Sequence, residues 1–301
     1  MNNKSKPDKR LLAQSFANAA RQYDDVAVIQ KMTGDELIDR LQLVKKQPER
    51  ILDLGSGTGR NTDLLAKIYP QAQVFSLDIA EAMLHHARKN QQQQQGLKRW
   101  IPLRQKPSYI VGDAEQLPLA DNSIDFVFAN LALQWCDPRV SFAEIQRVLK
   151  PEGLLMFTTL GPDTLLELRQ SWAVVDDYQH VNLFFDMHDI GEAMIEAGLS
   201  DPVLDIDRYT LTYKNLMGLM HDLKTLGAHN VNSGRRRGLT GRKAFAKLTE
   251  AYESFRQQGS LPATYEVVYG HAWCGQLSRN QQVQADGSVA IPVGQIKRKV
   301  N

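Results

Sequence analysis

Three glycines at alternate positions, Gly55, Gly57 and Gly59, follow a short apolar run and open a stretch of helical pattern. Glycine lets the backbone turn sharply and approach a ligand that any side chain would block. The spacing differs from the G-x-G-x-x-G of dinucleotide loops, because Arg60 stands where the third glycine is expected. Asp53, two residues before the first glycine, suits a cationic amino group better than a pyrophosphate. The loop indicates a pocket for a nucleotide-like cofactor, with a plain strand-to-helix turn as the alternative.

Two further carboxylates follow later apolar runs. Asp78 ends such a run roughly 20 residues past the loop, where a carboxylate can accept hydrogen bonds from both ribose hydroxyls. Asp113 directly follows the run 109–112. Each acid alone would more often be a helix N-cap or a turn residue. Three acids at the ends of three successive runs are hard to ascribe to capping, so we expect a shared site.

The order of apolar runs and helical patterns predicts an α/β fold. After a first strand at 51–53, strands are expected over 72–78, 109–112, 123–129, 154–159, 202–209 and 263–273, with helices over 61–69 and 80–90. Strands separated by helices imply a mostly parallel, doubly wound sheet of seven strands with flanking helices. Ligands of such sheets bind beyond the carboxyl ends of the strands, where the three acids fall. Residues 288–293 predict a short edge strand, and the glutamine tract 91–95 a solvated loop.

Bulk properties fit an ordinary enzyme. The chain has 301 residues, an ordinary apolar share and a formal net charge of +2, so nothing points to nucleic acid. Cys136 and Cys274 provide neither a disulfide framework nor a metal site, and we expect both to be reduced in a cytoplasm. Residues 1–10 are polar and basic without the apolar core of a signal peptide, and no run approaches a membrane span.

Helical patterns flank the predicted sheet at two places. Helices over 15–25 and 26–44 precede the first strand, and a pair over 215–226 and 240–257 lies between the last two strands. An insertion at that point can hang over the active-site edge and select the substrate. The expected divisions are an N-terminal lid (1–46), a core (47–209), a helical insertion (210–262) and a final strand with a tail (263–301).

The loop of this insertion carries a basic cluster, Arg235, Arg236 and Arg237, bounded by glycines. Such a cluster fits an acidic protein partner, or a phosphate or carboxylate on the substrate. A merely solvated charged face is the alternative.

Residues 53–59, D-L-G-S-G-T-G, resemble motif I of the class I S-adenosylmethionine (SAM) methyltransferases. The resemblance implies a Rossmann-like core that binds SAM and releases S-adenosylhomocysteine (SAH). It assigns Asp53 to the methionine amine and Asp113 to the adenine amine, and it implies an N-terminal lid that brings Tyr23 near the reacting groups. Packing of Tyr23 on the core is the alternative. The residues expected to bind the cofactor are Asp53, Gly55, Gly57, Gly59, Asp78, Ile79, Asp113, Ala114, Asn130 and Leu131.

Motifs along nearly the whole chain resemble the malonyl-[acyl-carrier protein] O-methyltransferases of biotin synthesis. They are 16–24 (F-A-N-A-A-R-Q-Y-D), 130–136 (N-L-A-L-Q-W-C), 161–168 (G-P-D-T-L-L-E-L), 185–189 (F-D-M-H-D), 226–230 (L-G-A-H-N), 235–241 (R-R-R-G-L-T-G) and 262–266 (P-A-T-Y-E). The resemblance implies O-methylation of the free carboxylate of a malonyl thioester on acyl carrier protein or coenzyme A. We expect Tyr23 and Trp135 at the methyl-transfer site as catalytic residues, and Arg235 to Arg237 at the malonyl thioester or its acidic carrier.

Two other functions share parts of this pattern. One is a methyltransferase-like assembly factor of respiratory complex I, which acts as an arginine hydroxylase, and the other is a SAM methyltransferase of a quinone or another small acid. The sequence offers no spacing of histidines and acids that suggests a general base. A malonyl carboxylate needs none, because a carboxyl group with a pKa of roughly 4 is already ionised at neutral pH.

Overall fold

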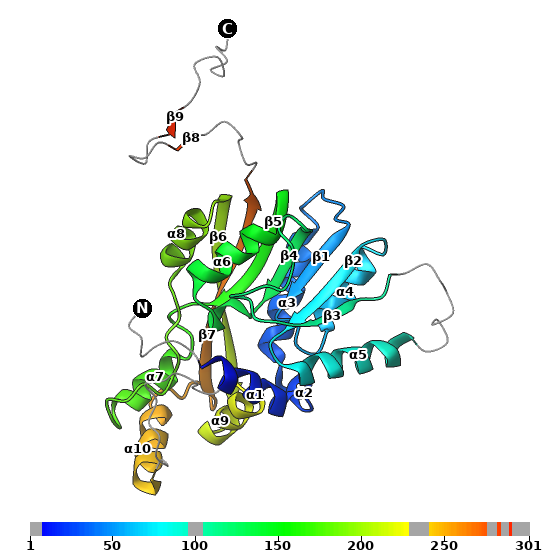
Figure 1. Ribbon diagram of the computed structural model, residues 1–301. Helices are drawn as coiled ribbons and strands as arrows, with labels where there is room; N and C mark the ends of the chain where they lie inside the picture. Colours follow the sequence, from blue (N-terminus) through cyan, green and yellow to red (C-terminus); the bar gives the residue numbers. More distant parts are fainter. Residues whose placement is uncertain (1–7, 96–104, 229–240, 276–281, 284–288, 291–301) are drawn as a thin grey trace.

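The computed structural model describes residues 8–95, 105–228, 241–275, 282–283 and 289–290, and its arrangement is shown in Figure 1. The basic cluster Arg235 to Arg237 lies outside the described residues.

A seven-stranded sheet forms the centre of the protein. Its strands are β1 (Arg50–Leu54), β2 (Gln73–Asp78), β3 (Ser108–Val111), β4 (Ile124–Asn130), β5 (Leu149–Leu160), β6 (Leu199–Tyr213) and β7 (Leu261–Cys274). They lie in the order β3-β2-β1-β4-β5-β7-β6. Neighbours from β3 to β5 are parallel, and β7 runs antiparallel to both β5 and β6. The predicted Rossmann-like, mostly parallel sheet is therefore confirmed.

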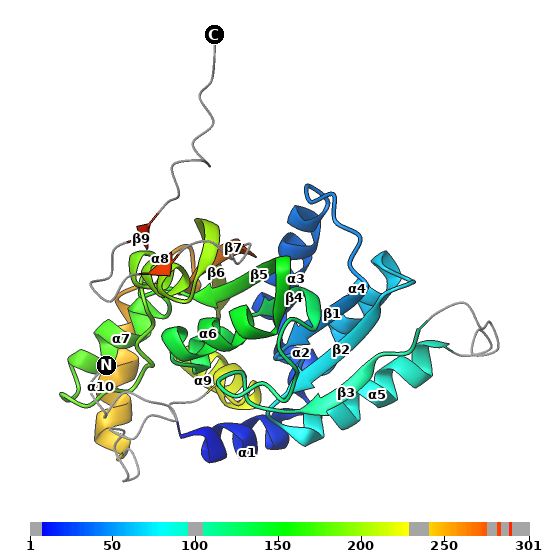
Figure 2. The same ribbon diagram turned by 45° about the horizontal axis from the view of Figure 1, so that its top comes forward.

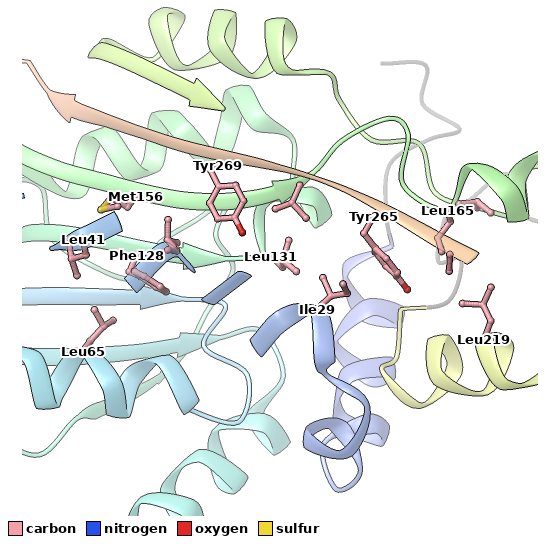
Figure 3. Packing of buried hydrophobic residues seen from close by; sticks show 14 of the residues in the cluster. Ile29, Leu41, Leu65, Phe128, Leu131, Met156, Leu165, Leu219, Tyr265 and Tyr269 are labelled. Atoms are coloured by element: carbon pink, nitrogen blue, oxygen red, sulfur yellow. The ribbon is translucent and has the colours of Figure 1, made fainter. Parts of the chain in front are cut away.

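Helices cover both faces of this sheet (Figures 1 and 2). One face packs against α3 (Val28–Leu41) and α4 (Arg60–Ile68), and the other against α6 (Pro138–Val148) and α8 (Met187–Glu196). Side chains alternate between the faces along each strand, so that Phe128 of β4 joins the first layer and Val127 the second. Figure 3 shows the first layer continuing from Phe128 past Tyr265, which lies on β7, to Leu219.

The remaining helices gather beside the carboxyl ends of the parallel strands, below the sheet in Figure 1. They are α1 (Lys9–Ala19), α2 (Tyr23–Val26), α5 (Glu81–Gln95), α7 (Leu166–Ala173), α9 (Leu216–Thr225) and α10 (Arg242–Glu253). Helix α1 begins where the Asp8 carboxylate accepts hydrogen bonds from the amides of Arg10 and Leu11. In the sequence, helices α9 and α10 come after β6 and before β7, where the helical pair was predicted. No helix in the described part of the chain is long and apolar enough to span a membrane.

Three local predictions need correction. The glutamine tract 91–95 is helical and extends α5, because glutamine is a good helix former and no glycine or proline interrupts the segment before Gly96. Three helices rather than two precede β1, since the helical conformation is interrupted near Gln22 and again at Ala27. Strand β9 (Val289–Ala290) pairs only with β8 (Gln282–Val283), so the predicted position at an edge of the main sheet is wrong.

At Gly270 of β7 the packing leaves no room for a side chain. A Cβ there would lie 2.3 Å from Cζ of Phe157 and 2.8 Å from Cδ2 of Leu204. We expect Gly270→Ala to lower the free energy of unfolding by about 1–3 kcal/mol through overpacking, measured by urea denaturation. Gly218→Ala is the matched control, because its Cβ would meet Tyr213 at an ordinary 3.4 Å and lies in a helix. Equal stability of the two variants would contradict this account.

Candidate active site

A cavity of about 80 Å³ lies at the carboxyl ends of β1, β2 and β4 and is closed on one side by α1. Its walls contain ten residues that the sequence singled out. These are Tyr23, Gly55, Gly57, Asp78, Ile79, Asp113, Ala114, Asn130, Leu131 and Trp135.

The glycine loop reaches the cavity in a conformation that favours glycine. Gly55 and Gly57 have φ angles of 71° and 54°. A Cβ on Gly55 would lie 2.3 Å from Cβ of Ala132, so no larger residue fits. The amides of Gly55 and Ser56 both donate to the carbonyl of Leu77, at 2.8 and 3.0 Å, which ties the loop to the end of β2. The loop therefore presents bare backbone to a ligand.

Asp78, the last residue of β2, lies in the cavity wall beside the glycine loop. Its Oδ2 accepts a hydrogen bond from the amide of Gly57 at 2.9 Å, and its Oδ1 accepts one from Ala80 at 2.8 Å. Burial raises the pKa of Asp78 to about 6, because the backbone amides that donate to it only partly replace the lost water. The carboxylate keeps lone pairs for further donors, and a pair of ribose hydroxyls would supply them.

Asp113 forms an ion pair with Lys9 of the N-terminal helix α1. Its Oδ1 lies 3.0 Å from Nζ of Lys9, which also lies 3.0 Å from Glu115. Both this contact and the hydrogen bond from the Glu115 amide use Oδ1, so Oδ2 keeps its capacity to accept. Sequence reasoning missed Lys9, because nothing in a polar basic stretch shows which carboxylate it will meet.

Two expected cofactor residues lie behind the cavity rather than in its wall. Asp53 is buried and accepts a hydrogen bond from Oγ1 of Thr62 at 2.5 Å. Burial raises the pKa of Asp53 to about 7. Gly59 begins α4, and a Cβ there would lie 2.7 Å from Cβ of Ala87. Gly59 thus allows α4 and α5 to approach, and a direct contact between Asp53 and the cofactor stays a prediction.

The N-terminal helices are fastened over the cavity at both ends. Leu12 and Phe16 of α1 line it, and the Phe16 ring meets Trp135 edge to face, with centroids 5.6 Å apart. At the other end, Oγ1 of Thr58 in the glycine loop donates to Asp24 at 2.6 Å. The cavity is smaller than typical ligand pockets of roughly 300–1,000 Å³.

Tyr23 and Asn130 have different surroundings. Burial, together with the charges of Asp78 and Asp24, raises the pKa of the Tyr23 phenol, which therefore stays protonated and keeps its hydrogen for donation at neutral pH. The side chain of Asn130 is already used: Oδ1 accepts from Thr33 and Thr158, each at 2.8 Å, and Nδ2 donates to a backbone carbonyl. The side chain of Asn130 therefore anchors α3 to the sheet, and a contact of this residue with the cofactor stays a prediction.

A larger hollow of about 1260 Å³ lies elsewhere, between the end of α3 and strands β6 and β7. Its central cation, Arg40, is already bound to Glu36, Asp205 and Asp207 and lies over the Tyr269 ring. The glycine loop takes no part in this hollow, so we place the chemistry in the smaller cavity.

Comparison with known proteins agrees with this geometry. Residues 52–157 match the family model described as a methyltransferase domain. The chain is 51% identical over 285 residues to the malonyl-[acyl-carrier protein] O-methyltransferase of Gallionella capsiferriformans, covering 94% of this chain and 96% of that protein. It is 50% identical to the protein of the same name from Laribacter hongkongensis, covering 88% and 89%.

The chain belongs to the malonyl-[acyl-carrier protein] O-methyltransferase family. A putative methyltransferase from Bacillus halodurans has the same fold, with a TM-score of 0.57 and 21% identity, covering 80% of this chain and 99% of that one. The predicted class I methyltransferase fold and family are confirmed.

The residues of the cavity fit SAM, the methyl donor of this enzyme class. Asp78 offers acceptors for ribose hydroxyls, and the positive φ angles at Gly55 and Gly57 open the backbone to a close ligand. Ile79, Met83 and other apolar side chains provide walls for a flat ring. When bound, SAM supplies an electrophilic methyl group on a positively charged sulfur.

We expect cofactor affinity to depend on the charge of Asp78. Ribose hydroxyls donate to the ionised carboxylate, so bound cofactor lowers its pKa, and SAH should bind more tightly as the pH rises through about 6. Isothermal titration with SAH between about pH 5 and 8 measures this, with a plateau above about pH 7. Asp78→Asn should weaken binding about 10- to 100-fold and flatten the rise, apart from any share of Asp53. Equal wild-type affinity at both ends of the range would contradict the assignment.

Proposed function

We propose that this enzyme transfers the methyl group of SAM to the free carboxylate of malonyl-[acyl-carrier protein] and so forms its methyl ester. The observation that carries the proposal is the identity of about half of the aligned residues to enzymes of that name. The alignment covers 94% of this chain and so includes the insertion after β6. Esterification removes the terminal charge of the malonyl group, and by family resemblance this lets fatty-acid elongation extend the chain toward the pimeloyl precursor of biotin.

The cavity suits an acceptor that needs no deprotonation. Among the described residues no histidine lines it, and the Tyr23 phenol is held protonated. The acceptor carboxylate forms an O–C bond as the methyl C–S bond breaks and its electron pair stays on sulfur, so no proton has to be removed. The protein has to align oxygen, methyl carbon and sulfur and to exclude water, which solvates the separated charges better than the neutral products. Phe16, Trp135 and Leu12 supply such a dry wall.

The proposal also covers partner and location. The acceptor is presented by acyl carrier protein. We propose that the cationic Arg235 to Arg237 contact anionic groups of this carrier, on the strength of their charge alone. Two free cysteines, Cys136 and Cys274, agree with a cytoplasmic enzyme. Relatives at 50% identity carry the methyltransferase name, so the assembly-factor and quinone alternatives are not favoured.

The direct test supplies the purified enzyme with SAM and malonyl-acyl carrier protein, and separately with malonyl coenzyme A. Mass spectrometry should show one added methyl group on the malonyl thioester and the release of SAH. Acetyl-acyl carrier protein is the matched control, because it has the same carrier and thioester but no free carboxylate. SAH binding without methylation of either malonyl thioester would overturn the proposal.

Tyr23→Phe tests whether the phenol acts on the acceptor. A hydrogen bond to a charged group contributes about 1.5–3 kcal/mol, so its loss should lower kcat about 10- to 100-fold. SAH affinity should change less than about twofold, because the ring that lines the cavity is kept. Tyr178→Phe, at an exposed tyrosine, is the control. Unchanged kcat would show instead that Tyr23 only packs on the core.

A further inference from the structure

Helix α1 touches the cofactor cavity and the helical insertion at the same time. One part of it lines the cavity with Lys9, Leu12 and Phe16. Its Ser15 meets the opposite partner, since Oγ donates a hydrogen bond of 2.9 Å to the carbonyl of Gly227, 212 positions later in the chain. In Figures 1 and 2, α1 and α9 accordingly lie side by side beneath the sheet.

Gly227 lies two residues past the end of α9, directly after its C-cap Leu226. Its amide donates to the Lys224 carbonyl, and the amide of Ala228 donates to that of Leu223, each at 3.1 Å. Its φ of 72° is of the left-handed kind that ends helices, and a Cβ would lie 3.0 Å from the carbonyl oxygen of Ser15. Ser15 and Gly227 are both buried. The contact is thus a close, fixed junction in which neither side can move far alone.

An apolar contact strengthens the same junction. Ala228 packs against the small cluster of Leu12, Phe16 and Trp135. Two of its members belong to α1 and all three line the cofactor cavity. The chain just past α9 therefore rests on the side chains that a bound cofactor would touch.

We propose that Ser15 is a positioning residue that couples the two substrates: cofactor held by α1 fixes the end of α9 through the Ser15–Gly227 hydrogen bond, and so prepares the insertion for the acceptor. The acceptor role of the insertion rests on the proposed function. Because binding free energies are linked, acceptor bound at the insertion tightens cofactor binding by the same factor.

Hydrogen exchange measures the first half of this coupling without any acceptor. SAH added to the wild type should slow exchange both in α1 and at the amides of Gly227 and Ala228. In Ser15→Ala, SAH should still slow exchange in α1 but no longer at the end of α9. Thr249→Ala is the matched control, because it removes a hydroxyl hydrogen bond of 2.9 Å inside α10 and leaves the junction intact. Protection confined to α1 in the wild type, or unchanged at Gly227 in Ser15→Ala, would overturn the proposal.

Calorimetry measures the second half, using the unreactive pair of SAH and malonyl-acyl carrier protein. Saturating carrier should tighten SAH binding to the wild type about three- to tenfold, the range expected from one buried hydrogen bond. In Ser15→Ala this factor should fall toward one, while SAH alone binds within about twofold of the wild type. Gly227→Ala should abolish the factor as well. An unaltered factor in Ser15→Ala would assign the residue to packing alone.

The two experiments separate this inference from the proposed function. If malonyl-acyl carrier protein is not the acceptor, no methyl ester forms, yet SAH-dependent protection at Gly227 still appears. If the enzyme methylates malonyl-acyl carrier protein but SAH leaves Gly227 unprotected, only the coupling is wrong.

Discussion

The hydrogen bond between the Gly57 amide and Asp78 is the constraint on which the rest of the site depends. Parallel pairing of β1 with β2 places Leu54 beside Leu77, so the chain leaves both strands at the same level. The glycine loop then folds back onto the end of β2 and donates to the Asp78 carboxylate. Burying a charge is costly unless donors replace water. Burial raises the pKa of Asp78 to about 6 despite the backbone amides that donate to it, so the carboxylate can still accept from donors such as ribose hydroxyls.

This arrangement explains why the loop requires glycine where it does. At Gly55 the obstacle is Ala132, at the end of β4, and at Gly59 it is Ala87 in α5. The first glycine therefore lets a neighbouring strand end close to the cavity, and the last lets two helices pack. Only Gly57 brings its backbone both to the cavity wall and to Asp78. One motif thus meets three separate packing demands, which a turn alone would not impose.

Local pattern was enough to predict most of the core and much of the cavity. Apolar runs ending in acids placed Asp78 and Asp113 at the correct edge, because the ends of parallel strands meet there whatever the loops do. The direction of a side chain was not predictable in the same way. Asp53 turns toward Thr62, and the side chain of Asn130 is taken up by Thr33 and Thr158, both outcomes of tertiary packing. The contact of Lys9 with Asp113 spans 104 positions, and no local signal encodes such a pair.

Packing between distant segments also bears on how the enzyme selects its acceptor. Methyl transfer to a carboxylate is helped by a dry site, yet a carrier-bound substrate must enter from solvent. One wall of the cavity is α1, which contacts the core through Lys9 and through the Phe16–Trp135 pair, and contacts the insertion through Ser15. The sheet has the same fold as a putative methyltransferase that is only 21% identical. We propose that discrimination of the acceptor falls to elements outside this sheet, and α1 contacts both the cofactor cavity and the insertion.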